Sequence, residues 1–124
     1  MKTDGQDFLE ALARFPVDTF ESRFSNIAVK LDLCAHLDRN ELKLLYEAAL
    51  TANLCNLAIN GWDTRSGEIR PENEPRRREL EEEFMVARDV LRASPGWQNL
   101  SGPEQEIIEW QFLQVFVRQE RLTQ

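Results

Sequence analysis

The chain has 124 residues, of which 42% are hydrophobic and 30% charged, and this composition excludes a disordered chain and predicts one globular domain, residues 1–124. The net charge of −7 is spread evenly, with six Lys and Arg against nine Asp and Glu in residues 1–60, and nine against thirteen in residues 61–124. Such a balance repels phosphate backbones and anionic lipids, so we expect no direct nucleic-acid partner and no membrane partner.

Helix starts in this sequence are marked by a short polar residue followed three positions later by an acid or amide. Thr3–Gln6 predicts a short first helix that ends at Pro16 and places three apolar side chains on one face: Phe8, Leu12 and Phe15. Asp18–Glu21 predicts the start of a second helix, whose apolar side chains recur every three or four positions: Phe20, Phe24, Ile27, Leu31 and Cys34.

A third helix is predicted from Asp38–Glu41 to Asn60, with Gly61 suited to a left-handed helix end. No charged residue occurs from Ala48 to Trp62, which is a stretch of fifteen residues. Since about 20 apolar residues are needed to cross a bilayer, this stretch predicts a buried helix and no membrane span.

A long connection follows over residues 61–73, and a fourth helix is predicted to begin between Asn73 and Pro75. Its apolar face consists of Leu80, Phe84, Ala87 and Leu91, and the turn Ser94–Gly96 ends it.

The first turn of this fourth helix carries three arginines that oppose the helix dipole. With the aromatic and basic residues of the connection they form a candidate partner-binding site for an anionic ligand or an acidic partner surface: Trp62, Arg65, Arg70, Arg76, Arg77 and Arg78. The alternative is simple ion pairing with glutamates one turn further on.

The last predicted helix opens with a capping box at Ser101–Glu104, and its segment Ile107–Val117 has apolar residues around most of the helical wheel. The length and the cap favour a helix over a strand, although β-branched and aromatic residues are frequent there. Apolar surface on nearly all sides implies burial on several sides, either as the central helix of a bundle or in a seam between two copies of the chain. We therefore expect a homodimer in which this helix supplies the interface residues Trp110, Leu113, Phe116 and Val117.

Few residues in the sequence point to catalysis. Cys34 and His36 are two positions apart and point in different directions on a helix, so they are poorly placed for a metal or a nucleophile–base pair. Two Glu-x-x-Glu pairs are of the kind that holds divalent metals between helices: Glu79 with Glu82, and Glu106 with Glu109. Charge-rich solvated helix faces explain these pairs better, since the single histidine is far from both pairs in the sequence.

The sequence thus predicts an all-α helical bundle of four long helices plus a short N-terminal helix. Two cysteines without a disulfide-like spacing, and no signal-like segment, favour the cytoplasm. We expect a non-enzymatic protein-interaction module without a cofactor, acting on another protein as an adaptor, assembly factor, inhibitor or regulator. The alternatives are a metal-dependent all-α hydrolase that uses the paired glutamates, and an acidic inhibitor that mimics nucleic acid.

Overall fold

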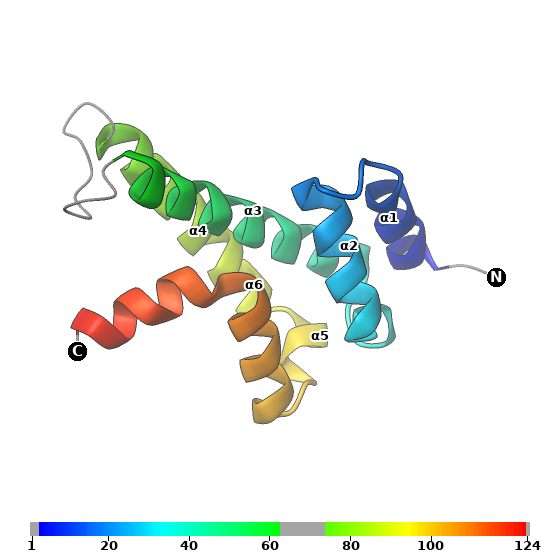
Figure 1. Cartoon of the computed structure of the whole chain (residues 1–124). Helices are drawn as coiled ribbons and strands as arrows, with labels where there is room; N and C mark the ends of the chain where they lie inside the picture. The colour runs from blue at the N-terminus through cyan, green and yellow to red at the C-terminus, as the bar shows by residue number, and fades with distance from the viewer. Residues whose placement is uncertain (1–2, 63–73, 124) are drawn as a thin grey trace.

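The computed structural model describes the backbone of residues 3–62 and 74–123, and the side chains of residues 3–54, 75–76 and 78–113. All its regular elements in these ranges are helices (Figure 1). They are α1 (Asp4–Ala13), α2 (Phe20–Lys30), the 3-10 turn η1 (Leu33–Ala35), α3 (Arg39–Trp62), α4 (Glu74–Arg92), α5 (Pro95–Gln98) and α6 (Gly102–Thr123). The predicted all-α class is confirmed, and the turns η1 and α5 are additions to the predicted helices.

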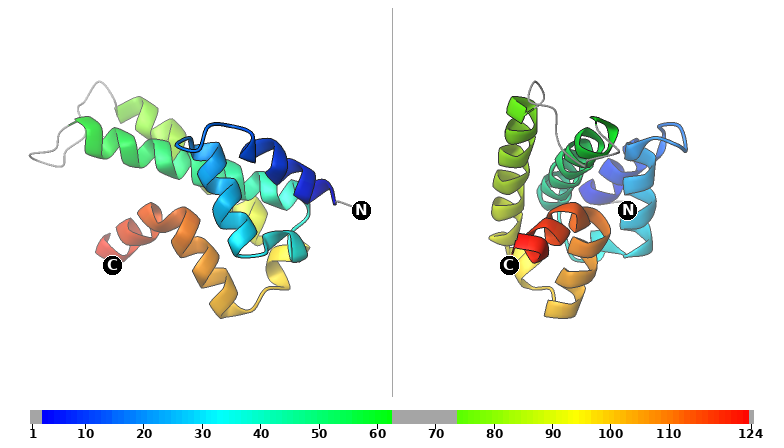
Figure 2. Two further views of the ribbon diagram at one scale, coloured as in Figure 1. Left: turned by 45° about the vertical axis from the view of Figure 1, so that its right-hand side comes forward. Right: turned by 60° about the vertical axis from the view of Figure 1, so that its left-hand side comes forward.

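The helices α3 and α4 form a long antiparallel pair that is the centre of the molecule (Figures 1 and 2). The helices α1 and α2 pack against each other at the N-terminal end of α3, and the first half of α6 also packs on α3. The helix α6 bends at Leu113, whose φ of −123° and ψ of 16° are not helical. Beyond this bend its C-terminal half turns to a new direction (Figure 1).

Two of the predicted capping boxes explain where α1 and α6 begin. The Thr3 hydroxyl accepts the Gln6 amide at 3.1 Å, and the Gln6 side chain accepts the Thr3 amide at 2.9 Å. The same exchange joins Ser101 to Glu104 at the start of α6. The start of α2 lies one residue later than predicted. There the Thr19 hydroxyl, and not Asp18, accepts the amide of Ser22 at 3.3 Å.

Glu41 lies in the first turn of α3 and also connects that helix to α5. Its carboxylate accepts the Asp38 amide at 3.0 Å, and Asp38 accepts the Glu41 amide at 2.8 Å. The other carboxylate oxygen of Glu41 accepts the amide of Trp97 at 3.2 Å. Glu41 is only 6% exposed, so one buried charge closes the first turns of two helices that are far apart in the sequence.

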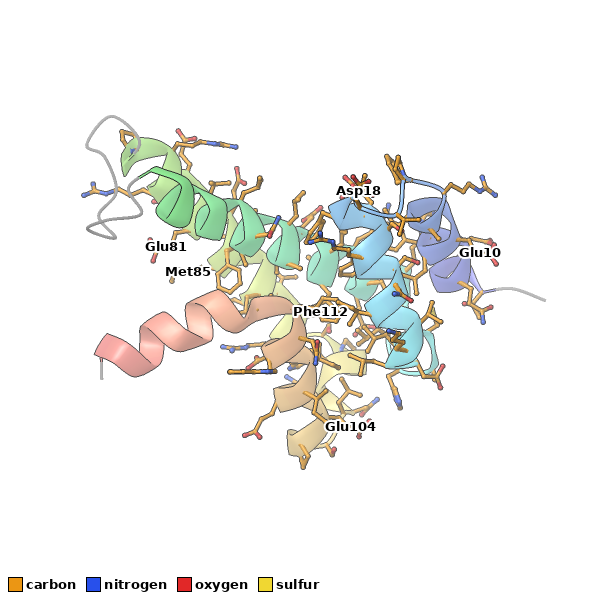
Figure 3. All side chains as sticks on the ribbon, in the orientation of Figure 1. Glu10, Asp18, Glu81, Met85, Glu104 and Phe112 are labelled. Carbon is orange, nitrogen blue, oxygen red and sulfur yellow. The ribbon has the colours of Figure 1, made fainter. Side chains whose placement is uncertain are left out.

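The core lies where α2, α3, α4 and α6 meet. Phe24 of α2 is fully buried, with its ring centre 5.3 Å from that of Tyr46 and 4.9 Å from that of Phe112, which Figure 3 labels on α6. The predicted apolar face of α4 is confirmed, since Leu80, Phe84, Ala87 and Leu91 are all buried. Trp97 of α5 is 3% exposed and covers one end of this core.

Two predictions for the helix ends were wrong. Phe15 does not share the buried face of α1, because that helix ends at Ala13; Leu9 and Leu12 fill the face, and Phe15 is 49% exposed. Gly61 does not end α3, which continues to Trp62. Trp62 is therefore the last residue of a helix and not part of the connection. In the described ranges, no helix is long and apolar enough to span a membrane.

Candidate functional site

A groove between α3 and α4 is the clearest candidate site. It has a volume of about 710 Å³ and is open to solvent. The lining residues are Leu44, Glu47, Leu50 and Thr51 of α3 with Glu79, Glu82, Glu83, Val86, Ala87 and Val90 of α4. On each helix these residues are spaced by one, three or four positions, so each wall is a single stripe along a helix. The groove follows the antiparallel pair lengthwise for about 16 Å, which is the rise of eleven helical residues.

The apolar part of the groove is unusually accessible. Val86 and Val90 are one turn apart on α4 and are 65% and 51% exposed, whereas Ala87 between them is buried. The hydroxyl of Thr51 donates to the carbonyls of Glu47 and Ala48, at 2.9 and 3.0 Å. The hydroxyl hydrogen of Thr51 is thus used within α3, and the groove presents mainly apolar surface at this point.

Both walls of the groove also contribute carboxylates. Glu47 comes from α3, and Glu79, Glu82 and Glu83 come from the first half of the α4 stripe. Glu79 is paired with Arg76, whose guanidinium lies 3.1 Å from its carboxylate. Glu47, Glu82 and Glu83 are exposed and form no ion pair with another residue of the described part. The α4 wall is therefore acidic over its first half and apolar from Val86 to Val90, and the α3 wall adds one carboxylate between two leucines.

The predicted Arg and Trp site lies partly within the described residues. Arg76 and Arg78 are exposed on the first turns of α4, and Arg76 is engaged with Glu79. Arg65 and Arg70 lie outside the described residues, as do the side chains of Trp62 and Arg77. The arginines at the start of α4 adjoin the glutamates of the groove along the same helix.

The structure does not bring the two Glu-x-x-Glu pairs together. No three His, Cys, Asp or Glu side chains of the described part are arranged to hold a metal ion, and this part includes all four glutamates. Glu79 is bound to Arg76, and Glu109 is bound to Arg92 of α4 at 2.7 Å. The Glu109–Arg92 pair joins α6 to α4 and leaves that carboxylate engaged.

Cys34 and His36 are also separate. Burial, and then the negative charge of Asp32, raise the pKa of the Cys34 thiol, which keeps it protonated at neutral pH. The Nε2 of His36 lies 3.7 Å from a carboxylate oxygen of Glu104, the residue labelled at the start of α6 in Figure 3. No hydrogen bond joins Cys34 to His36, and the side chain of Cys55 lies outside the described residues.

The predicted dimer interface on α6 divides into two kinds of position. Leu113 is 2% exposed and belongs to the core of its own chain. Trp110 is 44% exposed, and Ile107, one turn before it, is 50% exposed. The side chains of Phe116 and Val117 lie outside the described residues. The accessible apolar surface of the described α6 is therefore the face that carries Ile107 and Trp110.

The sequence alone does not reveal the groove, because each lining residue taken singly looks like an ordinary core or surface residue of a helix. Val86 and Val90 fall outside the predicted apolar face of α4, and this was the available signal: two β-branched residues on the supposedly polar side of a charged helix. These two valines line a groove only because α3 packs beside them.

No family model, curated protein or solved structure matches this chain. The function is therefore inferred from the geometry and charge of the molecule.

Proposed function

We propose that this chain is a non-enzymatic protein-interaction module that holds a segment of a partner protein in the α3–α4 groove. The observation that carries the proposal is the exposure of Val86 and Val90, 65% and 51%, along a groove wall. Apolar side chains in such a position gain from being covered, by roughly 25 cal/mol for each Å² removed from water.

The shape of the groove supports a protein segment over a small molecule. Small-molecule sites enclose most of the ligand and direct several polar groups at it. This groove is open along its side, and the one hydroxyl that lines it, that of Thr51, is bonded to its own helix. Long, open grooves between helices are instead suited to an amphipathic helix of another chain.

The reactive side chains outside the groove also favour binding over catalysis. The Cys34 thiol has a raised pKa, so it is a weak nucleophile at neutral pH. His36 lies beside Glu104 and has no hydrogen bond to that thiol in the described part. The arginines at the start of α4 adjoin the groove, and we propose them as a second contact, for acidic residues of the partner outside the segment in the groove.

Site-specific crosslinking tests this proposal. A photoreactive amino acid in place of Val90 is expected to form an adduct with a partner in a lysate of the cells that make the protein. The same amino acid in place of Val17, which is 88% exposed but far along the chain from the groove, is the matched control. Adducts from the Val17 position alone, or equal adducts from both positions, would contradict docking in the groove.

A second variant connects the adduct to the groove. Val86→Lys places a charge on the exposed apolar wall and is expected to remove the Val90 adduct. Its melting temperature is expected to stay within a few degrees, because substitutions at exposed positions usually change stability by at most about 0.5 kcal/mol. A probe in place of Arg78 shows whether the basic start of α4 is part of the same surface.

A further inference from the structure

We infer that the segment held in the groove is a basic amphipathic helix, with Lys or Arg side chains flanking its apolar stripe. This inference rests on the proposed function and specifies the chemistry of the partner. It follows from the arrangement of charge around the apolar surface of the α3–α4 groove.

The two walls of the groove together offer unpaired negative charge on both sides of a bound segment. Glu47 belongs to α3, whereas Glu82 and Glu83 belong to α4, and all three are exposed. None of the three forms an ion pair with another described residue, in contrast to Glu79, which is bound to Arg76. With no ion pair to any described side chain, these carboxylates can pair with cations that a partner brings.

The dimensions of the groove indicate the length of the segment. The α4 stripe from Glu79 to Val90 rises about 16 Å, which equals three turns of a helix. A helix of this length presents apolar side chains at positions i, i+3 or i+4, and i+7 to the valines. Cationic residues beside that stripe then lie within reach of Glu47 on the α3 wall and of Glu82 and Glu83 in the first half of the α4 wall.

Charge selects between otherwise similar partners. An acidic amphipathic helix would place carboxylates next to Glu47, Glu82 and Glu83, and like charges in contact are unfavourable. A basic helix gains from each contact and also from faster association with a protein of net charge −7. Both gains are screened by salt, so the affinity for a basic helix must fall as ionic strength rises.

Fluorescence anisotropy with three synthetic peptides tests the inference. All three are fifteen residues long and share one leucine stripe at helical spacing, and they carry Lys, Gln or Glu at the flanking positions. The Lys peptide is expected to bind the full chain at least tenfold more tightly than the Gln peptide at 50 mM salt, and the Glu peptide least tightly. Raising the salt to 500 mM is expected to remove most of the advantage of Lys.

A charge-neutral groove is the decisive variant. Glu47→Gln, Glu82→Gln and Glu83→Gln in one chain are expected to bring the Lys and Gln peptides within threefold of each other. The matched control is a chain with Asp7→Asn, Asp18→Asn and Glu106→Gln, three exposed acids outside the groove, which has the same net charge. This control is expected to keep the tenfold preference, and circular dichroism melting shows that both variants are folded.

Different failures have different meanings. Equal binding of the Lys and Gln peptides to the unaltered chain would overturn the inference and leave groove docking intact. Equal loss in the control variant would show that the overall charge, and not the groove, attracts the peptide, and would also overturn it. Binding of none of the peptides would overturn the basic-helix occupant, while the Val90 crosslink decides the proposed function separately. A dimer that Val86→Lys dissociates would make a second copy the occupant, against the inference.

Discussion

At the scale of single residues, Glu41 decides how two parts of the chain are joined. Burial by itself raises the pKa of this carboxyl, but the amides of Asp38 and Trp97, which donate to it, and the nearby polar groups of Ser94 and Gly96 outweigh burial and hold the pKa below the ordinary value of 4.5. Because the folded pKa lies below the unfolded one, the ionised carboxylate stabilises the fold above about pH 4.5. This stabilisation is lost as the pH falls through the folded pKa.

Glu41→Gln is expected to lower the free energy of unfolding at pH 7 by about 1–3 kcal/mol, because the amide cannot accept all the N–H groups that face the carboxylate. Urea unfolding followed from pH 7 to pH 3 measures this. The gap between the native chain and the variant is expected to close below pH 4.5 as the native carboxylate takes up a proton. Glu47→Gln, an exposed change on the same helix, serves as the control. A gap that is constant over the whole range would contradict the role of the charge.

Gly96 permits the close approach of Glu41 to the start of α5. A Cβ atom at this position would lie 2.7 Å from the carboxyl carbon of Glu41. Gly96→Ala is therefore expected to destabilise the protein by about 1–3 kcal/mol, as overpacking in a core does. Gly102→Ala is the matched control, since a Cβ there meets nothing within 4 Å. It is expected to be neutral or to add up to about 1 kcal/mol. Equal effects of the two changes in thermal melting would refute the packing argument.

At the scale of elements, the apolar side chains around α6 fall into a buried group and a half-exposed group. Ile108, Phe112 and Leu113 enter the core of the chain, with Leu113 at the bend of the helix. Ile107 and Trp110 remain about half exposed on another side. A surface that is apolar on several sides is thus buried on one side within the chain, which leaves an apolar strip for contact with a second copy.

The homodimer stays a prediction, and the exposed strip of α6 offers a direct test. Light scattering at micromolar concentration is expected to give about twice the chain mass of 14.5 kDa. Ile107→Gln combined with Trp110→Gln is expected to yield a folded monomer, because it replaces two apolar side chains that are about half exposed by polar ones and so reduces the gain from covering this strip. Gln111→Ala, on the same turn but polar and exposed in the native chain, is the control. A native protein that is already monomeric would end this hypothesis.

At the scale of the whole molecule, the acidic side chains of the described residues do not converge on a metal centre. The glutamates of the two Glu-x-x-Glu pairs are partly engaged, with Glu79 bound to Arg76 and Glu109 to Arg92. Metal sites need several carboxylates that converge within a few ångströms and are held there by neighbouring groups.

We expect Mg²⁺ or Mn²⁺ at 1 mM to change the melting temperature by less than a few degrees, because a ligand stabilises a protein only when it binds the folded state specifically. Thermal melting with and without the metal measures this, with Ca²⁺ as a test of general ionic effects. A larger rise with Mn²⁺ that disappears when Glu79, Glu82, Glu106 and Glu109 are all changed to Gln would replace the interaction module by the metal-dependent hydrolase.

Much of the local structure could be predicted from the sequence, because caps and helical faces depend on residues three or four positions apart. The capping boxes at Thr3, Asp38 and Ser101 and the buried face of α4 from Leu80 to Leu91 are of this kind. The ends of helices were predicted less accurately than the helical faces. The cap of α2 and the last residues of α3 depend on small competing interactions, and the prediction missed each by one or two residues.

The sequence by itself determined that the protein is an all-α bundle of acidic helices with a substantial core, since composition, periodicity and capping are properties of short stretches of chain. Only the tertiary structure decided which surfaces remain open. The groove depends on α3 lying beside Val86 and Val90, and the buried charge of Glu41 depends on Trp97, 56 positions away. Such contacts between distant segments are set by how whole helices pack, and no local pattern in the sequence encodes them.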